Sequence, residues 1–195
     1  MQLTVLTDKM IFSKISALSS NNAKVIVNIS IIISPIGTII AAADNDYLYI
    51  VCFEDTKQFE NKFKVLAKEL SCRFVHEENK ILNTLKEELL CYFNGNLKKF
   101  SVPLKTLGSD FQKNVWMKLQ EIPFGSTYTY SDITKALGRP TTHARAVGSA
   151  CGANTHLIVT PCHRLISLSS KGGFNSGINR KEWLIEHEKK YANNL

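Results

Sequence analysis

Cys162 stands in a setting that could make it a nucleophile. His163 and Arg164 follow it in the segment TPCHRLI (160–166), directly after an apolar run at 157–159. A cysteine attacks as a thiolate, and its ordinary pKa of about 8.5 leaves little thiolate at neutral pH. A neighbouring histidine can take the proton, so a thiol beside an imidazole has the ingredients of an activated nucleophile.

The carboxylate that would orient such a histidine is expected at Glu188, in a helix predicted over residues 179–191. At 100° per residue, an arc of about 140° on one face of this helix holds Arg180, Trp183, Leu184, His187, Glu188 and Tyr191. Mostly outside this arc fall Lys181, Glu182, Glu186, Lys189 and Lys190. A carboxylate at the edge of a buried face needs a partner, and His163 could be that partner. The alternative is that the helix frays into solvent and leaves Glu188 on the surface.

The proton of Cys162 needs a path to His163. Neighbouring residues of an extended strand point to opposite faces, so the two side chains could bond directly only across a sharp turn. We therefore expect a bridging water molecule between them. A carboxylate behind the histidine would fix its tautomer and stabilise the imidazolium.

The other four cysteines are not followed by a histidine and an arginine. Cys52 and Cys91 are interpreted as small core hydrophobes, Cys72 as a boundary residue, and Cys151 as a residue of the core or of a pocket. The five cysteines are odd in number, scattered and never in CxxC spacing, which argues against a disulfide framework and a zinc site. We expect a reducing setting, the cytoplasm or a eukaryotic nucleus.

The uncharged stretch 25–43 could be a membrane span or a hairpin. It is long enough to cross a bilayer, but Pro35, Gly37 and several polar residues interrupt it. The β-branched runs on either side of SPIG (34–37) are typical of two strands joined by a turn. We therefore expect no membrane span. The N-terminus also lacks the organisation of a secretory signal.

The first half is predicted to be a small α/β unit. Alternating apolar runs and turn signals predict a small antiparallel sheet over 29–53, and helical spacing predicts helices over 59–70 and 81–93. A linker at 94–107 separates this unit from the rest of the chain.

The second half is predicted to be mainly helical. An apolar stripe predicts a helix over 111–122, and two short helices over 131–137 and 142–153 flank a turn at Gly138. Two short helices across a tight turn that contains glycine form a candidate helix-turn-helix.

The second of these short helices carries a smooth ridge. Ala144, Gly148 and Gly152 fall four residues apart, and Arg145 projects beside them. Each glycine inside a helix costs about 1 kcal/mol relative to alanine, so the ridge needs a compensating contact. Tight packing against another helix and contact with DNA are both open.

The net charge of +7 is concentrated in the second half. Residues 1–100 carry 12 Lys and Arg against 11 Asp and Glu, whereas residues 101–195 carry 12 against 6. A basic half is expected of a protein that meets a polyanion. Solubility alone is the alternative.

Three segments together resemble the O6-alkylguanine-DNA alkyltransferases, also called methylated-DNA-protein-cysteine methyltransferases. They are TPCHRLI (160–166), HARAVGSACGAN (143–154) and RKEWLIEHE (180–188), within a resemblance that extends over 108–188. The segment SPIGTIIAAADNDYLYIVCFED (34–55) is similar to the N-terminal domain of that family. Residues 1–24 match nothing that we can place.

The resemblance implies an α+β fold of two domains. Residues 1–100 would form a small N-terminal α/β domain with an RNase H-like sheet, in which residues 1–24 are an unplaced extension. Residues 101–195 would form a mainly helical, winged-helix-like domain that carries the alkyl acceptor and the helix-turn-helix.

The resemblance also implies DNA repair in one irreversible turnover. An alkyl group such as methyl would move from the O6 position of guanine in duplex DNA to Cys162 after the damaged base is flipped out of the helix. His163 would be the general base acting through water, and Glu188 would orient it. The chemistry needs no metal and no cofactor. We expect a monomer whose partner is double-stranded DNA containing O6-alkylguanine.

The same resemblance assigns roles to further residues. Asn154 would hold the active-site turn, Arg145 would enter the base stack through the minor groove, and Tyr130 would press on a phosphate and donate a hydrogen bond to the flipped base. The substrate pocket would be lined by Leu165, Phe174 and Asn175. The DNA would be contacted by Gln112, Tyr130, Ser131, Arg139, Ala144, Arg145 and Gly148.

The sequence also departs from the family pattern. Thr155 follows Asn154 where the family usually has proline, and Phe174 stands where tyrosine is frequent. The segment 175–177 reads Asn-Ser-Gly where Gly-Gly is usual. A related group without activity has tryptophan in place of the cysteine, so the presence of Cys162 favours an active protein.

Two other functions use part of the same evidence. A cysteine hydrolase would use Cys162 and His163 with an oxyanion hole, but it would leave the basic helix-turn-helix and Arg145 without a role. A DNA-binding regulator with a structural cysteine would need a further activator or metal-binding domain, for which 195 residues leave little space.

Overall fold

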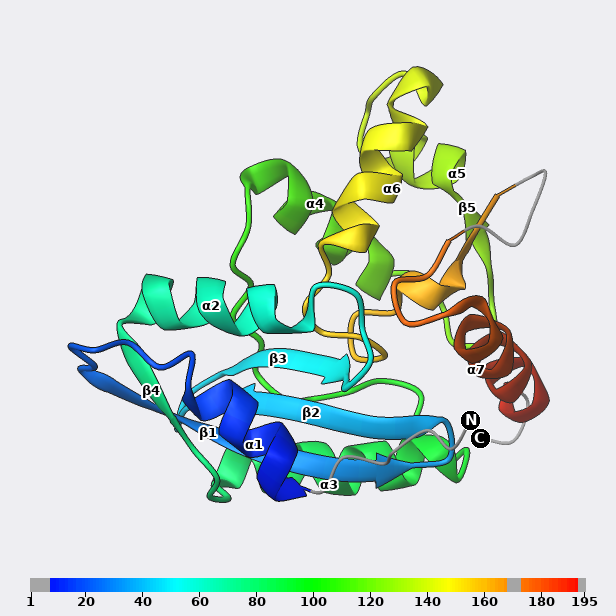
Figure 1. The fold of residues 1–195 in the computed structure, drawn as a ribbon. Coiled ribbons are helices and arrows are strands. Elements are labelled where there is room, and N and C mark those ends of the chain that lie inside the picture. The colour runs from blue at the N-terminus through cyan, green and yellow to red at the C-terminus, as the bar shows by residue number, and fades with distance from the viewer. Residues whose placement is uncertain (1–7, 168–172, 193–195) are drawn as a thin grey trace, which may run out of the picture. The chain divides into compact units, whose positions relative to one another are not determined.

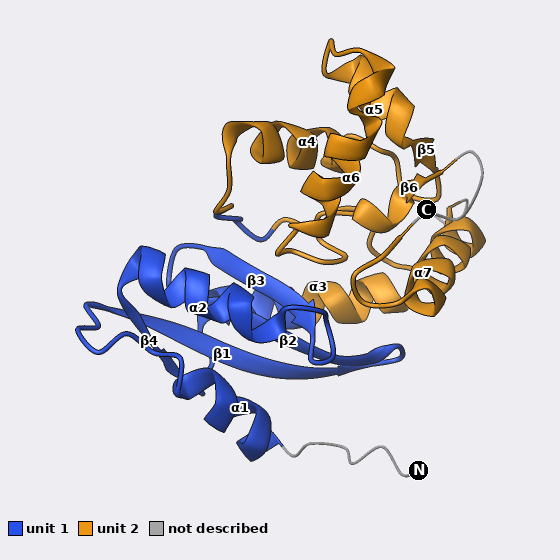
Figure 2. Cartoon of the chain, turned by 45° about the horizontal axis from the view of Figure 1, so that its top comes forward, with its two compact units in different colours: residues 1–86, 102–105 blue, residues 87–101, 106–195 orange. Residues whose placement is uncertain are grey.

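The structure, a computed structural model, describes residues 8–167 and 173–192, which form two compact units (Figures 1 and 2). Unit 1 comprises Met1–Lys86 and Val102–Lys105, and unit 2 comprises Glu87–Ser101 and Thr106–Leu195. The division falls inside helix α3 (Lys80–Phe93). The predicted α+β organisation in two parts is confirmed, while the boundary expected after residue 100 stays a prediction.

Unit 1 is built on a four-stranded sheet. Its strands are β1 (Val25–Ser34), β2 (Gly37–Ala43), β3 (Leu48–Phe53) and β4 (Cys72–Val75), in the order β3-β2-β1-β4. The predicted hairpin is present, with Ser34 paired to Gly37 at the turn. Gly37 has φ 126°, a conformation that favours glycine.

The antiparallel sheet predicted over 29–53 is confirmed by β1, β2 and β3, but the prediction missed β4, which pairs with β1 in parallel. This strand has four residues, of which Cys72 and Phe74 point inward, and that is too short for an alternating pattern to be recognised. Cys72, interpreted as a boundary residue, is fully buried. A parallel pair also needs a crossover connection, here through α2 (Phe59–Leu70), so no local turn signal announces it.

Two helices of unit 1 bury one face each. In α2 the buried residues are Phe63, Leu66 and Ala67, in agreement with the predicted helix. Helix α1 (Asp8–Ser16) lies in the extension that the sequence left unplaced, and it buries Ile11 and Ile15. It contacts α2 and β4, so this part of the extension belongs to the core of unit 1.

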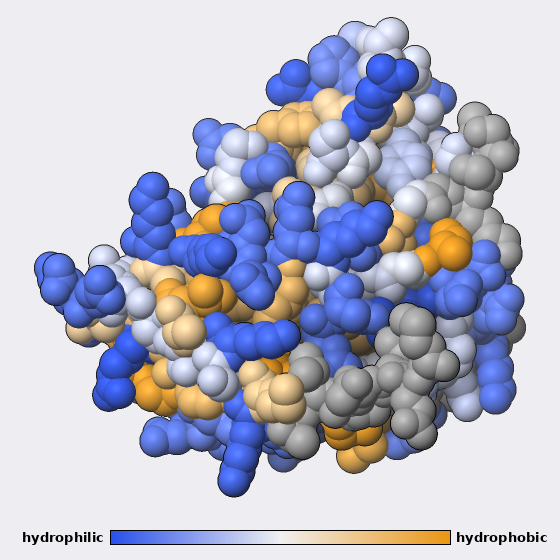
Figure 3. Space-filling view, viewed as in Figure 1, coloured by the Kyte–Doolittle hydropathy of each residue, from blue (hydrophilic) through white to orange (hydrophobic). Residues whose placement is uncertain are grey.

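The uncharged stretch 25–43 is accounted for by β1 and β2. In the described residues, 8–167 and 173–192, no helix is long and apolar enough to span a membrane. On the face shown in Figure 3, hydrophilic residues predominate and apolar residues form small patches between them. Such scattered apolar residues are ordinary on a folded surface.

Unit 2 is mainly helical, as predicted. Its helices are α4 (Asp110–Gln120), α5 (Tyr130–Ala136), α6 (Ala144–Gly152) and α7 (Ile178–Tyr191). Two 3₁₀ turns, η1 (Thr141–His143) and η2 (Cys162–Arg164), and two short parallel strands, β5 (Tyr128–Thr129) and β6 (Leu165–Ile166), connect them.

Helices α5 and α6 with the turn between them lie where the sequence placed the helix-turn-helix. A capping box of Thr129 and Asp132 begins α5. Gly138, at φ 64°, follows its end. In α4, the Trp116 indole donates a 2.9 Å hydrogen bond to the carbonyl of Ala150 and so fixes α4 against α6.

Two cysteines outside the site had been interpreted as core residues. Cys52 is buried in β3, as expected. The interpretation of Cys91 was wrong, because this residue is exposed on α3. The buried positions of that turn are Leu89 and Tyr92, and Cys91 lies on the outward side between them.

Candidate active site

Cys162 begins the tight turn η2, and its whole tripeptide is buried. The Cys162 amide donates a 2.8 Å hydrogen bond to the Thr160 carbonyl, and the chain then enters β6. The assumption of an extended strand at this point was wrong, because 3₁₀ geometry replaces the alternation of faces. Pairing of β6 with β5 sets Tyr128 opposite Leu165, which brings the start of α5 to the cysteine turn.

Asn154 holds this turn from the end of α6. Its Nδ2 donates to the Thr160 carbonyl at 2.9 Å and lies 3.3 Å from Cys162 Sγ, and its Oδ1 accepts from the His156 amide at 2.9 Å. An amide that donates to sulfur favours the thiolate over the thiol. The loop between Asn154 and the turn also holds Ile158 at φ 73°, a strained conformation for a β-branched residue.

His163 and Glu188 form a buried pair. The Nε2 atom of His163 lies 2.7 Å from Glu188 Oε1, and the two side chains are 0% and 1% exposed. Because an ionised carboxylate only accepts, Nε2 carries the hydrogen and Nδ1 of the neutral ring keeps its lone pair. Nδ1 has no hydrogen-bond partner among the described residues. The buried position expected for Glu188, rather than a frayed one, is what the structure shows.

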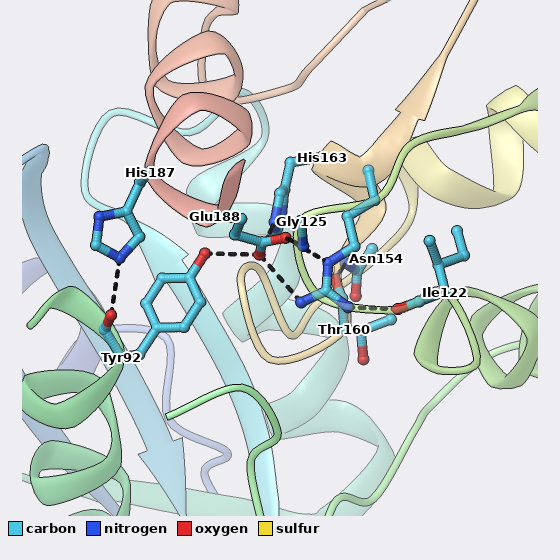
Figure 4. A network of polar contacts seen from close by, with 9 residues as sticks. Tyr92, Ile122, Gly125, Asn154, Thr160, His163, His187 and Glu188 are labelled. Carbon is cyan, nitrogen blue, oxygen red and sulfur yellow. Dashed lines mark hydrogen bonds and ion pairs between the residues drawn. The ribbon is translucent and has the colours of Figure 1, made fainter. Parts of the chain in front are cut away.

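Tyr92 and Gly125 lie beside Glu188 together with His163 (Figure 4), and Arg164 completes the shell. Arg164 binds both carboxylate oxygens, Nε to Oε2 at 2.7 Å and Nη2 to Oε1 at 3.0 Å, and its Nη1 donates to the Ile122 carbonyl. The Tyr92 hydroxyl donates to Oε1 at 2.9 Å, and the Gly125 amide donates to Oε2 at 3.1 Å. The two oxygens are therefore saturated with donors.

The surroundings of the His163–Glu188 pair keep the carboxylate charged and the imidazole neutral. Burial lowers the pKa of His163, and the Arg164 and Lys181 charges lower it further against the opposing effect of Glu188. Burial alone would raise the pKa of Glu188, but the bonds from His163 and Arg164 outweigh it and hold that pKa below its ordinary value. At neutral pH the site thus contains a carboxylate and a neutral imidazole.

Cys162 faces a cavity of about 230 Å³. The cavity is lined by Tyr130, Gly148, Cys151, Gly152, Leu157, Cys162, Gly173, Phe174 and Asn175. Of the predicted pocket residues, Phe174 and Asn175 lie in this wall, and the Asn175 amide donates to the Gly152 carbonyl across it. Leu165 is buried in β6, and the described lining contains Leu157 instead. Cys151, left open between core and pocket, lines the cavity.

A second hollow of about 410 Å³ adjoins the first and shares Tyr130 and Gly148 with it. It is lined by Thr129, Tyr130, Ser131, Ala144, Arg145, Gly148, Ile166 and Ser167. Five of the seven residues predicted to contact DNA are therefore neighbours. Of the other two, Arg139 is exposed over the Phe111 ring and Gln112 closes the capping box of α4.

The glycines of α6 are not required by packing inside the protein. A Cβ atom at Gly148 would lie 3.7 Å from the Tyr130 ring, and one at Gly152 would lie 3.7 Å from the Asn175 side chain. Both are ordinary contact distances, so alanine would fit at either position. Tight helix packing therefore does not account for the ridge, and both glycines face the hollows.

Three residues of this site were not predicted from the sequence. Arg164 adjoins the cysteine and the histidine, and Tyr92 lies one turn after the buried Leu89, so each had a signal. Lys181 was placed outside the buried arc of the last helix, and this was wrong: its side chain is 0% exposed. It lies one turn before Leu184 on the buried face of α7.

No cluster of three or more metal-ligating side chains occurs in the part of the chain that the structure describes. The polar groups at this site are instead the amide of Asn154, which bonds the Cys162 sulfur, and the imidazole of His163, which is bonded to the carboxylate of Glu188. This set is suited to controlling the proton of a thiol.

Both units match models of one protein family. Residues 110–190 match "6-O-methylguanine DNA methyltransferase, DNA binding domain", and residues 28–106 match "6-O-methylguanine DNA methyltransferase, ribonuclease-like domain". Together the two matches cover most of the chain.

Curated relatives carry one name. The methylated-DNA–protein-cysteine methyltransferase of Methanosarcina acetivorans is 40% identical over 156 residues, which are 80% of this chain and 94% of that protein. The inducible one of Bacillus subtilis is 36% identical, over 71% of this chain and 78% of its own length. A probable one from Acanthamoeba polyphaga mimivirus is 46% identical over 51% of this chain, and the match covers 66% of that protein, just under two thirds.

Solved structures from Mycobacterium tuberculosis have the same fold. The O6-methylguanine methyltransferase superposes with a TM-score of 0.72 at 35% identity, over 85% of this chain and 94% of its own. The OGT protein in complex with DNA gives a TM-score of 0.72 at 33% identity, over 86% and 94%.

Proposed function

This chain belongs to the 6-O-methylguanine DNA methyltransferase family, and from that premise we propose that it repairs DNA by moving an alkyl group from guanine O6 to Cys162 in a single turnover. The observation that carries the proposal is the geometry at Cys162. Its sulfur opens on a cavity, accepts an amide hydrogen from Asn154, and adjoins a histidine whose other nitrogen is fixed by Glu188.

In the proposed reaction, the Cys162 thiolate forms when His163 Nδ1 removes the thiol proton through a water molecule. The thiolate then attacks the alkyl carbon, and the new carbon–sulfur bond forms as the carbon–O6 bond breaks. Guanine leaves with the electron pair of the broken bond and takes up one proton, which balances the proton lost by Cys162 and restores the ordinary keto form with hydrogen on N1. The product is a thioether, which contains no acyl group for water to cleave, so one protein molecule repairs one base.

Tyr130 is the proposed donor to the base during this step. Burial, with contributions from Cys151 and Cys162, raises the pKa of its hydroxyl to about 12. The hydroxyl therefore keeps its hydrogen at neutral pH. Tyr130 also lines both hollows, so one side chain can meet the flipped base and the strand that it came from.

The second hollow is the proposed exit of the base from the duplex. The target atom is inaccessible in stacked DNA, and flipping a base out costs a few kcal/mol. Arg145, exposed on α6, would fill the space that the base leaves and so offset this cost. The glycine ridge beside it lets the helix approach the minor groove closely.

The direct test uses duplex DNA with O6-methylguanine whose methyl group carries an isotope label. We expect a mass gain of one methylene unit on Cys162, at most one equivalent per protein, and none from a duplex with ordinary guanine. Trypsin cuts after Arg145 and Arg164, so Cys151 and Cys162 share one peptide, and fragment spectra must separate them. Cys151→Ser should still be labelled.

The variant Cys162→Ala should bind the duplex and gain no label. Full transfer by this variant would exclude Cys162 as the acceptor. The competing functions give other outcomes: a cysteine hydrolase would release the label into solution, and a passive DNA-binding regulator would leave it on the guanine.

A further inference from the structure

Lys181 is buried and bonded to Gly173, a residue that lines the same cavity as Cys162, and the described residues offer no carboxylate to balance its charge. Its side chain is 0% exposed, and its Nζ donates to the Gly173 carbonyl at 3.3 Å. Among the described residues no carboxylate of Asp or Glu forms an ion pair with it. A buried ammonium without an anionic partner is costly, so a compensating interaction is expected.

The groups that act on this ammonium are the two thiols of the cavity. Burial lowers the pKa of Lys181, while Cys162, and to a smaller degree Cys151, raise it. The Lys181 charge in turn lowers the pKa of His163. The ammonium therefore lies within electrostatic reach of the sulfur and the imidazole.

The other ionisable groups around Cys162 cannot supply a second charge partner. Glu188 is saturated by Arg164, His163 and Tyr92. Tyr130 keeps its hydrogen, and burial raises the pKa of Cys151 above its ordinary value. Arg164 is paired with Glu188, whereas the ammonium of Lys181, bonded to Gly173 at the cavity wall, has no carboxylate partner among the described residues.

We propose that Lys181 is the counter-cation of the Cys162 thiolate, and that the resting protein holds an ammonium–thiolate pair beside a neutral His163. Lys181 is not part of the described cavity lining, so it acts on the substrate only through the sulfur. Lys181 is therefore a positioning residue, whose charge stabilises the thiolate without contacting the substrate. His163 then passes the thiol proton on rather than keeping it, because the nearby ammonium disfavours the imidazolium.

This inference deepens the proposed function, since the thiolate is the species that would accept the alkyl group. The alternative is that the four-carbon stem of Lys181 merely fills space. Lys181→Met separates the two, because methionine fills similar volume without charge. A space-filling role predicts unchanged reactivity of Cys162 in that variant.

The test measures the rate at which iodoacetamide alkylates Cys162 as a function of pH, in the full chain and without DNA. In Lys181→Met we expect the half-maximal rate to move up by about one pH unit or more, the usual effect of removing an adjacent opposite charge. At neutral pH the alkylation of Cys162 should be at least about tenfold slower than in the parent, and at high pH the two rates should converge. Lys181→Arg, which retains the charge, should stay close to the parent profile.

Two controls are available in the same chain. Lys189 is exposed on the same helix, so Lys189→Met should leave the profile of Cys162 unchanged. The exposed Cys91 lies in a different tryptic peptide from Cys162, and its own profile should be identical in every variant.

An unchanged profile of Cys162 in Lys181→Met, with native circular dichroism, would overturn the proposal. So would a shift that appears at Cys151 but not at Cys162. If Lys181→Met does not fold, Lys181→Gln gives the same comparison with a polar side chain, and the same two results decide it. If the pH profile of Cys162 shifts in Lys181→Met but the parent protein transfers no methyl group from DNA, this inference stands and the proposed function is excluded.

Discussion

Glu188 accepts hydrogen bonds from four groups of unit 2, and the one from the charged Arg164 depends most on its negative charge. Arg164 is the critical partner, because its guanidinium is buried and always charged. In Glu188→Gln we expect a loss of about 3 kcal/mol in the free energy of unfolding, since removal of one member of a buried pair leaves the other uncompensated. Urea denaturation of the variant and the parent measures the difference.

The matched control is Glu186→Gln on the exposed side of the same helix. It should change the free energy of unfolding by less than about 0.5 kcal/mol. A loss of similar size in both variants would mean that helix propensity, and not the buried network, is responsible.

Glu188 should also make the stability depend on pH. Its pKa in the folded protein is held below the ordinary value of 4.5, so the unfolded chain binds the proton more tightly. The stabilisation by Glu188 is therefore fully present above about pH 5 and is lost as the pH falls below 4.5. In Glu188→Gln the fall in stability between pH 5 and pH 3 should be shallower, as urea titrations at several pH values would show.

At the scale of the elements, local periodicity correctly predicted the features that depend on neighbouring residues, namely the extent of several helices and the buried face of one of them. The inward position of Glu188 followed from the spacing of one helix, and α2, α4 and α7 lie close to their predicted ranges. Lys181 was missed because the helical spacing places it just outside the arc predicted to be buried. Its ammonium is bonded to the carbonyl of Gly173, a contact between separate segments that helical spacing does not predict.

Contacts between segments that are distant along the chain could not be predicted, because local periodicity does not report them. Tyr92 lies 96 residues from Glu188 along the chain, and the parallel strand β4 meets β1 only after a crossover helix. The functional roles of Arg145 and Tyr130 came from the family resemblance. The structure adds that the two side chains border one hollow.

Helix α6 should gain stability and lose function when its ridge is filled. In Gly148→Ala we expect the free energy of unfolding to rise by up to about 1 kcal/mol, because alanine favours the helix and meets no close contact. Methyl transfer from duplex DNA should become slower, since the new methyl group projects into both hollows. Single-turnover transfer and urea denaturation measure the two effects.

Ser149→Ala is the control on the exposed side of α6. It should change helix propensity without altering transfer. Slower transfer in Ser149→Ala as well, or full activity of Gly148→Ala, would contradict the role of the ridge.

At the scale of the whole molecule, the uneven charge predicts binding to DNA that weakens steeply with salt. Each phosphate contact contributes about 0.9 to the slope of log K against log salt for duplex DNA. If Arg139 contacts a phosphate, Arg139→Ala should reduce the slope by about 1. Fluorescence anisotropy of a labelled duplex at several salt concentrations measures it.

Lys68→Ala changes the charge by the same amount on the exposed surface of α2 in unit 1. Its slope should equal that of the parent protein. Equal reductions in both variants would show that net charge alone, without a localised interface, governs the binding.

The placement of the two tryptophans gives this protein a built-in optical reporter. Trp116 is bonded to the backbone of α6, whereas Trp183 is stacked on His187 within the aromatic cluster of α7. In Trp183→Phe, the remaining indole emission should change when duplex DNA is added, because Trp116 is anchored to the helix that is proposed to enter the groove. Repair could then be followed in real time by stopped-flow mixing, with no dye on either partner.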